Sequence, residues 1–333
     1  MNYEAPVLRM SYIGGPESGK TTAIIGGSIA LAKQFGSEFR APAVDPEQRA
    51  FFSNSWDMLK RTGEFPLPTA GDKTVEYELM LRRLNQPVVP ISVVDYRGGI
   101  VKAAEKNSYG PLSEHFAKCA SLNVVMNGLD VVDFFRGESD PEDIGRVAEG
   151  VLDDVYEQRD SLPPICVQVT KADLLVGLAE TPEERRAKLI GLARASFPSL
   201  FTEQTTTVVV PTSVYDFDEK VYPLNMEVPY LFGLDHYLRR HGDALEENAT
   251  ALRDTVAELG QKLAQREQLP AFQRFLGYFS TVRTRHRMAR TEATRTEVAG
   301  RHTWISEAQE AIAKEMSAWP VWREGNWSGD AVV

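Results

Sequence analysis

The apolar and polar residues of this chain alternate between two kinds of pattern over roughly the first 235 positions. Short apolar runs, typical of strands, are followed by segments with apolar residues three and four positions apart, typical of helices. The pattern predicts strands at 7–13, 74–82, 88–95, 121–127, 165–170 and 207–211. It predicts helices at 22–35, 46–60, 141–159 and 182–197. This alternation is typical of an α/β fold with a mostly parallel sheet flanked by helices.

The connection between the first predicted helix and the second predicted strand is unusually long. Residues 39–69 would make an uncommonly long loop, and they carry a helical signal of their own in Phe51, Phe52, Met58 and Leu59. We therefore interpret residues from about 40 to 66 as a helical insertion.

From residue 237 to 333 the pattern is mainly helical. One run of apolar residues recurs at alternating spacings of four and three, which is a coiled-coil seam: Leu245, Ala249, Leu252, Val256, Leu259 and Leu263. Leu269-Pro270 interrupts it, and a second helical stretch follows, with a later one around 305–312. We expect an α-helical extension, either a hairpin or a small bundle. Packing on itself or on the preceding domain is favoured, with oligomer formation as the alternative. Residues 319–333 are expected to be loosely ordered.

Composition places the chain among soluble globular proteins. It has 333 residues, of which 43% are hydrophobic and 25% charged, so two domains are expected, divided near residue 236. The net charge of −10 argues against nucleic-acid binding. The cysteines, Cys119 and Cys166, lie in or beside apolar runs and are expected to be buried, reduced thiols of a cytoplasmic protein. No apolar run is long enough to predict a membrane span.

A phosphate-binding loop follows the first predicted strand. The chain reads Gly14-Gly15-Pro16-Glu17-Ser18-Gly19-Lys20-Thr21, which matches G-x-x-x-x-G-K-[ST], and Thr22 continues into a predicted helix. In such a loop the glycines let backbone N–H groups surround phosphate oxygens, the lysine reaches the β- and γ-phosphates, and the hydroxyl binds Mg²⁺. A strand followed by a glycine loop and a helix N-terminus also directs the helix dipole at an anion. The sequence therefore predicts a nucleoside triphosphate site.

Polar residues at the ends of later strands extend this prediction. Asp95-Tyr96-Arg97-Gly98 follows an apolar strand, where the Asp95 carboxylate can support a Mg²⁺ ion and the Gly98 N–H can reach a γ-phosphate. Thr170-Lys171-Ala172-Asp173 resembles the [NT]-K-x-D motif of GTPases, whose aspartate accepts hydrogen bonds from guanine and whose lysine stem covers the base. Thr212-Ser213-Val214 resembles the last GTPase motif, which meets the guanine carbonyl.

These motifs, in this order, resemble the Ras- and Arf-like, translation-factor-related P-loop GTPases. The closest resemblance is to prokaryotic small GTPases, including those of bacterial defence or signalling gene clusters. It covers about residues 6–235 and implies a G domain, GTP and GDP as ligands, Mg²⁺, and a protein effector or regulator. It also implies a switch threonine that binds Mg²⁺ only in the GTP state. The segment around 68–71 indicates Thr69 for this role, with Thr62 as a second choice.

One departure from the family pattern concerns hydrolysis. Gly99 occupies the position after D-x-x-G where Ras-like proteins usually carry a glutamine that orients water. Nucleotide binding should survive this change, whereas intrinsic hydrolysis should be slow. Lys20, Thr69 and Gly98 are then the expected catalytic groups, with a stabilising arginine from a partner or from Arg61 or Arg97.

Two other functions stay open at this point. A P-loop kinase or ATPase could close an arginine-rich helix over a transferred phosphoryl group, but it would leave Thr170–Asp173 unexplained. A scaffold that binds GTP without hydrolysing it could assemble through the helical extension. The basic residues of that extension are interpreted as a solvated helix face: Arg283, Arg285, His286, Arg287 and Arg290.

Overall fold

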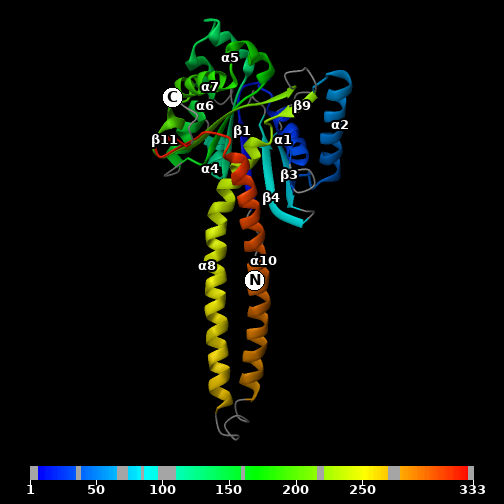
Figure 1. Ribbon diagram of the computed structural model, residues 1–333, viewed down its shortest axis with the longest axis vertical. Helices are drawn as coiled ribbons and strands as arrows, with labels where there is room; N and C mark the ends of the chain where they lie inside the picture. The colour runs from blue at the N-terminus through cyan, green and yellow to red at the C-terminus, as the bar shows by residue number, and fades with distance from the viewer. Residues whose placement is uncertain are drawn as a thin grey trace. The chain divides into compact units, whose positions relative to one another are not determined.

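The computed structural model describes residues 7–34, 39–65, 74–83, 86–96, 110–158, 162–215, 221–268 and 278–328 (Figure 1). The chain divides into two compact units. The first consists of Met1–Asp235 with Ala313–Val333, and the second of His236–Ile312. We propose that the first unit is the nucleotide-binding domain and that the second is a helical extension.

The first unit is built on a mixed sheet whose described strands follow the order β11-β10-β7-β6-β5-β1-β4-β3-β2. Its centre is parallel and consists of β1 (Leu8–Ile13), β4 (Gln86–Asp95), β5 (Ser121–Met126), β6 (Ile165–Val169) and β7 (Thr206–Pro211). Antiparallel strands extend both edges: β2 (Phe39–Arg40) and β3 (Val75–Arg83), and β10 (Val321–Arg323) and β11 (Asn326–Ser328). A separate ribbon pairs β8 (Ser213–Tyr215) with β9 (Val221–Leu224). The predicted α/β fold with a mostly parallel sheet is confirmed.

The helices of this unit include each one that the sequence predicted there. These are α1 (Lys20–Gln34), α2 (Pro46–Thr62), α6 (Pro141–Gln158) and α7 (Pro182–Ser196). N-cap residues explain where two of these helices begin. The side chains of Asp45 and Thr181 accept hydrogen bonds from backbone N–H groups in the first turns of α2 and α7. Short elements that were not predicted are α4 (Gly110–Ala117), α5 (Gly128–Phe135) and the 3₁₀ turns η1 (Ala172–Leu178) and η2 (Pro198–Phe201).

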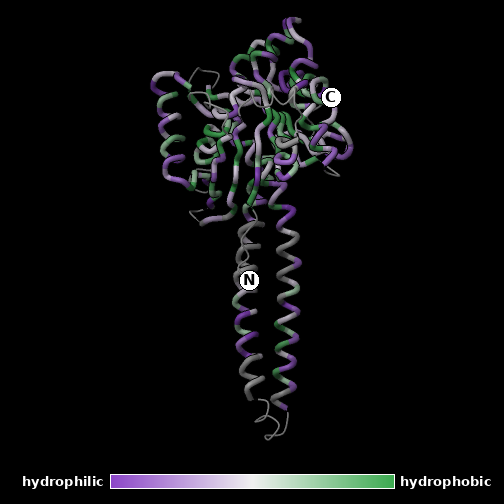
Figure 2. The backbone as a smooth tube through the Cα atoms, turned by 180° about the vertical axis from the view of Figure 1, so that it is seen from behind, coloured by the Kyte–Doolittle hydropathy of each residue, from purple (hydrophilic) through white to green (hydrophobic). Residues whose placement is uncertain are grey.

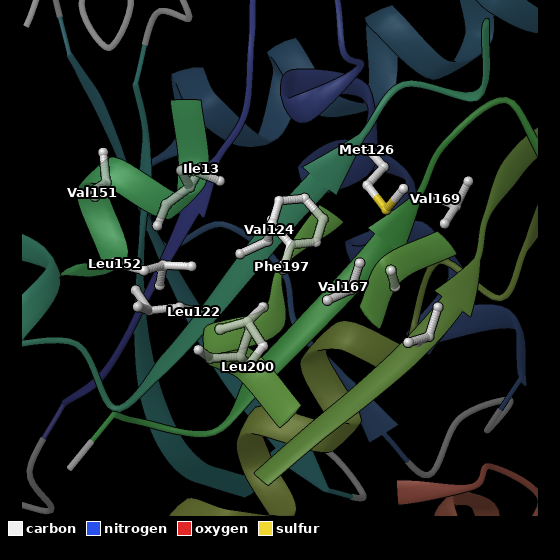
Figure 3. Close-up of a cluster of buried hydrophobic side chains, with 14 of the residues drawn as sticks. Ile13, Leu122, Val124, Met126, Val151, Leu152, Val167, Val169, Phe197 and Leu200 are labelled. Atoms are coloured by element: carbon white, nitrogen blue, oxygen red, sulfur yellow. The ribbon is translucent and has the colours of Figure 1, made fainter. Parts of the chain in front are cut away.

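One face of the sheet carries the hydrophobic cluster shown in Figure 3. Side chains from β1, β5 and β6 meet residues of α4, α6 and α7, including Val151 and Leu152 of α6, and also Phe197, which directly follows α7. The central strands are correspondingly hydrophobic in Figure 2. Cys119 belongs to this cluster, while Cys166 is buried in β6, and neither forms a disulfide. The prediction of buried thiols is confirmed.

The opposite face is covered by α1 and by the beginning of α8 (Val228–Glu267). Tyr230 of α8 is fully buried and donates a hydrogen bond to the carbonyl of Ile24 in α1. α8 is unbroken, with its first two turns in the first unit and the remainder in the second.

Residues 321–328 correct the expectation that residues 319–333 are loosely ordered. They form the β10–β11 hairpin, and β10 pairs antiparallel with β7 at the edge of the main sheet. Glu324 and Gly325 make its turn with φ of 49° and 79°. The rings of Phe201, Trp322 and Trp327 lie 5.6 to 6.0 Å apart between centroids, and the Trp322 Nε1 donates to the carbonyl of Thr202. Aromatic packing therefore orders this polar segment.

The second unit is a helical hairpin made by α8 and α10 (Tyr278–Met316). A Cβ on Gly242 would lie 3.8 Å from Oε1 of Gln309, and the pKa of Glu258 is lowered by its hydrogen bond to Lys262 and also by Arg287. These contacts pair the helices in antiparallel order. Val256 and Leu259 of the predicted seam are buried. The side chains of Leu245, Ala249 and Leu252 are not among those that the structure describes.

The basic residues of α10 fit the solvated-face interpretation. Arg285, His286, Arg287 and Arg290 are exposed, and the side chain of Arg283 is not among those described. Within the described ranges, no helix has both the length and the hydropathy needed to cross a membrane.

The buried carboxyl group of Glu227, just before α8, should make the stability of the folded protein depend on pH. Burial, together with the neighbouring Glu315, raises the pKa of Glu227 to about 7, against an opposing contribution from its own backbone N–H. Between the ordinary value of 4.5 and about 7, the folded protein holds a proton that the unfolded chain releases, so stability falls as pH rises through this window. Glu227→Gln should remove that fall, which amounts to about 3 kcal/mol by pH 8. Urea unfolding at pH 5 and pH 8 measures it.

The matched control is Glu203→Gln, which makes the same chemical change at an exposed position. It should retain the pH dependence of the unmodified chain. An unchanged pH slope in Glu227→Gln would contradict the assignment.

Candidate nucleotide-binding site

The phosphate loop connects β1 to α1 in a tight path. A Cβ on Gly14 would lie 2.9 Å from both Ser18 Oγ and the carbonyl oxygen of Val125, so no larger residue fits there. Gly19 has φ of 91°, in the left-handed region that glycine tolerates best. The carbonyl of Gly19 accepts from Ala23 N at 2.8 Å, which begins the hydrogen bonds of α1. The loop therefore ends at a helix N-terminus.

Lys20 lies with its ammonium group against this loop. Its Nζ donates to the carbonyls of Gly14 at 2.9 Å and Gly15 at 2.7 Å, and to Ser18 Oγ at 3.3 Å. Burial lowers the pKa of Lys20 from 10.5 to about 8, while Asp95 opposes that shift. A largely buried cation beside a helix N-terminus favours an anionic ligand, because such a ligand would compensate the desolvated charge.

A hydroxyl and a carboxylate meet beside the lysine. Thr21 Oγ1, in the first turn of α1, donates to Asp95 Oδ2 at 2.6 Å, and Asp95 is buried at the carboxyl end of β4. Oxygen ligands of this kind suit Mg²⁺, which usually binds through one or two protein oxygens together with substrate phosphates. The described residues contain no group of three or more His, Cys, Asp or Glu side chains that could hold a metal alone. Thr21 and Asp95 thus fit a Mg²⁺ ion shared with a polyphosphate.

Thr170 connects the phosphate loop to the strand ends beyond it. Its buried hydroxyl lies 2.7 Å from the carbonyl of Ser18 and 3.2 Å from that of Met126. Lys171 then adopts a left-handed backbone with φ of 54°, and Ala172 N donates to the carbonyl of Thr212 at 3.0 Å. The segments after β6 and β7 are consequently joined to each other and to the loop.

Asp173 and Ser213 form a pair at this junction. Ser213 Oγ donates a hydrogen bond to Asp173 Oδ1 and accepts one from Tyr215 N at 3.0 Å. Ser213, Thr212 and Val214 are buried, whereas Asp173 is only partly buried. A carboxylate held in this way can accept hydrogen bonds from two adjacent donors of a ligand.

Replacing Thr170 should destabilise the fold measurably. Thr170→Val keeps the shape of the side chain but leaves the Ser18 and Met126 carbonyls without this donor. We expect the free energy of unfolding to fall by about 1–3 kcal/mol, because buried carbonyls lose hydrogen bonds. Denaturant unfolding measures this, with Thr74→Val at an exposed position as the control. Equal stability of the two variants would contradict the connecting role.

The remaining predicted site residues differ in where they lie. Gly15, Pro16, Glu17 and Ser18 lie in the phosphate loop, and Thr22 lies in the first turn of α1. Arg61 is exposed in the last turn of α2, where a cation suits the helix dipole, and Thr62 bonds to Met58 in the same helix. Thr69, Arg97, Gly98 and Gly99 lie outside the described residues.

The sequence analysis missed the contribution of the end of β5 and of the residues that follow it. Val125 and Met126 present their carbonyls to Gly14 and Thr170, and a Cβ on Gly128 would lie 2.3 Å from the carbonyl oxygen of Thr170. Asn127 begins α5 by accepting from Leu129 N. An Asn-Gly pair directly after an apolar strand was the available signal.

Comparison with known proteins gives only distant similarity. No protein-family profile and no curated protein matches the sequence. Among solved structures, the chain is similar to the signal recognition particle receptor SRb-GTP/SRX complex from Chaetomium thermophilum, at 14% identity and a TM-score of 0.38 over 64% of this chain and 93% of that one. It is also similar to the mammalian SRP receptor, at 12% identity and a TM-score of 0.35 over 68% and 98% of the chains. TM-scores this low support no functional conclusion.

Proposed function

We propose that this protein is a cytoplasmic GTP-binding switch that hydrolyses GTP slowly to GDP and phosphate with Mg²⁺. The observation that carries the proposal is the meeting of Lys20, the Thr21–Asp95 pair and the Asp173–Ser213 pair around one phosphate loop. These groups follow the carboxyl ends of β1, β4, β6 and β7. Ligands of α/β proteins bind in the crevice outside those strand ends.

Each group has a defined role in the proposal. Lys20 and the loop N–H groups neutralise the phosphates, and Thr21, Thr69 and Asp95 complete the surroundings of Mg²⁺, which would balance charge between the β- and γ-phosphates. Asp173 accepts from the guanine N1–H and exocyclic amine, with Lys171 over the base. Segments around 69 and 98–106 would order with GTP and relax with GDP, which changes what a protein partner can bind.

Hydrolysis is proposed to be slow because Gly99 has no side chain to orient water. Acceleration would then require an arginine, supplied by Arg61, Arg97 or a partner protein, and such a residue typically increases the rate by about 10³–10⁵.

Identifying the nucleotide carried by the purified protein tests base and hydrolysis state together. We expect GTP or GDP, released by EDTA, and GTP competing far better than ATP for the emptied site in the presence of Mg²⁺. Binding of ATP with no preference for GTP would remove the guanine assignment.

Single-turnover hydrolysis with and without cell extract separates the remaining functions. A switch should turn over slowly alone and faster with extract. A GTP-binding scaffold would show no turnover in either case, and a kinase would require a small-molecule acceptor.

A further inference from the structure

The beginning of α8 lies unusually close to α1, the helix that starts at the phosphate loop. A Cβ on Gly26 would lie 2.1 Å from Sδ of Met226, and one on Gly27 would lie 2.3 Å from Cε2 of Tyr230. Gly27 in particular is required, because a Cβ there would also lie 2.8 Å from the backbone carbonyl oxygen of Met226. We name residues 226–235 the root of α8.

Tyr230 joins the two helices by a hydrogen bond as well as by packing. Its hydroxyl donates to the carbonyl of Ile24 at 3.1 Å, in a position with no solvent exposure. Ile24 follows Lys20 by four residues, which is about one helical turn. The root of α8 is therefore fixed one turn from the lysine of the phosphate loop.

The segment leading into the root also reaches the Asp173–Ser213 pair. Asn225 Nδ2 donates to the carbonyl of Pro211 at 2.9 Å, and β9 pairs with β8 so that Leu224 lies opposite Ser213. The adjoining residues 224–230 therefore contact both α1, near Lys20, and the strands that hold the Asp173–Ser213 pair.

We infer that the root of α8 transmits nucleotide occupancy from α1 to the rest of α8, with Tyr230 as the positioning residue. This inference rests on the proposed function. A bound triphosphate would draw the Lys20 ammonium from the Gly14 and Gly15 carbonyls towards phosphate oxygens and would order the first turn of α1. Close-packed helices cannot absorb such a change locally, so the root moves or stiffens with α1. α8 then carries the nucleotide state towards residues 236–312.

Hydrogen exchange across α8 tests the inference in the full chain. Nucleotide-free protein is compared with protein saturated by a non-hydrolysable GTP analogue and Mg²⁺, with binding measured on the same sample. Coupling energies between sites typically correspond to factors of about 5–150. We expect amide exchange in residues 228–240 to slow about tenfold on binding. In Tyr230→Phe, which removes the hydroxyl and keeps the ring, the slowing should fall below about threefold.

Tyr237→Phe is the matched control, because it removes the same group from the same helix seven residues further on, where Tyr237 packs against His241. It should keep the full slowing. Gly27→Ala, which displaces the Tyr230 ring, should reduce the slowing as Tyr230→Phe does. The inference is overturned if the analogue binds but leaves α8 exchange unchanged, or if Tyr230→Phe responds like the unmodified chain; the proposed function would survive both results. A sample that binds no guanine nucleotide overturns the proposed function and this inference together.

Discussion

Lys20→Met should weaken GTP binding about a thousandfold, which corresponds to about 4 kcal/mol. The ammonium group is the buried cation of the loop, with its donors already directed at the carbonyls of Gly14 and Gly15. Methionine has a similar length but no charge, so the phosphates would lose charge-assisted hydrogen bonds that are worth about 1.5–3 kcal/mol each. Isothermal titration with GTP and Mg²⁺ measures the loss.

Lys60→Met is the control, because Lys60 is exposed in α2, and it should bind GTP normally. Thermal unfolding distinguishes loss of the ligand contact from loss of the fold. Burial lowers the pKa of Lys20, so its charge destabilises the folded state, whereas its hydrogen bonds to the Gly14 and Gly15 carbonyls stabilise it. Lys20→Met removes both contributions, so its melting temperature should stay close to that of the unmodified chain. Binding within threefold of the unmodified chain would refute the role given to this lysine.

Asp173→Asn should change which base is bound. An aspartate accepts from both the N1–H and the exocyclic amine of guanine, whereas an asparagine amide offers one acceptor and one donor group. We expect GTP affinity to fall by at least about a hundredfold, because a site built around hydrogen bonds strongly rejects a mismatched partner. Xanthosine triphosphate, which has a carbonyl in place of the amine, should become the preferred ligand. Competition between the two triphosphates measures the preference.

Ser213→Ala is the graded control for this substitution. It removes the hydroxyl that donates to Asp173 but leaves the carboxylate, so affinity should fall by about tenfold while guanine stays preferred. An unchanged base preference in Asp173→Asn would show that Asp173 does not read the base.

Much of the first unit was predictable from the sequence because its central elements obey simple rules. Buried parallel strands appear as nearly continuous apolar runs, as in 88–94, and capped helices such as α2 and α7 start at recognisable residues. Short elements lacked such signals. α5 has only eight residues and begins at the glycine of an Asn-Gly pair that resembles a turn, and β10 and β11 have three residues each around Glu324-Gly325. Segments this short contain too little periodicity to predict.

The sequence motifs indicated the residues of the candidate site but not the contacts between them. The motifs indicated Ser18, Thr170, Asp173 and Ser213 separately. The hydrogen bond from Thr170 to Ser18 joins residues 152 positions apart and depends on the strand order, which local patterns do not encode. The roles of Thr69, Arg97, Gly98 and Gly99 stay predictions.

The hairpin of β10 and β11 has a practical consequence for any attempt to isolate the first unit. Because the chain leaves that unit along α8 and re-enters it before β10, deleting everything after residue 236 would strip a strand from β7. It would also remove the Trp322 and Trp327 rings and so expose Phe201, and an uncovered strand edge invites aggregation. Excising the helices and rejoining the cut ends with a short flexible linker would keep that edge covered.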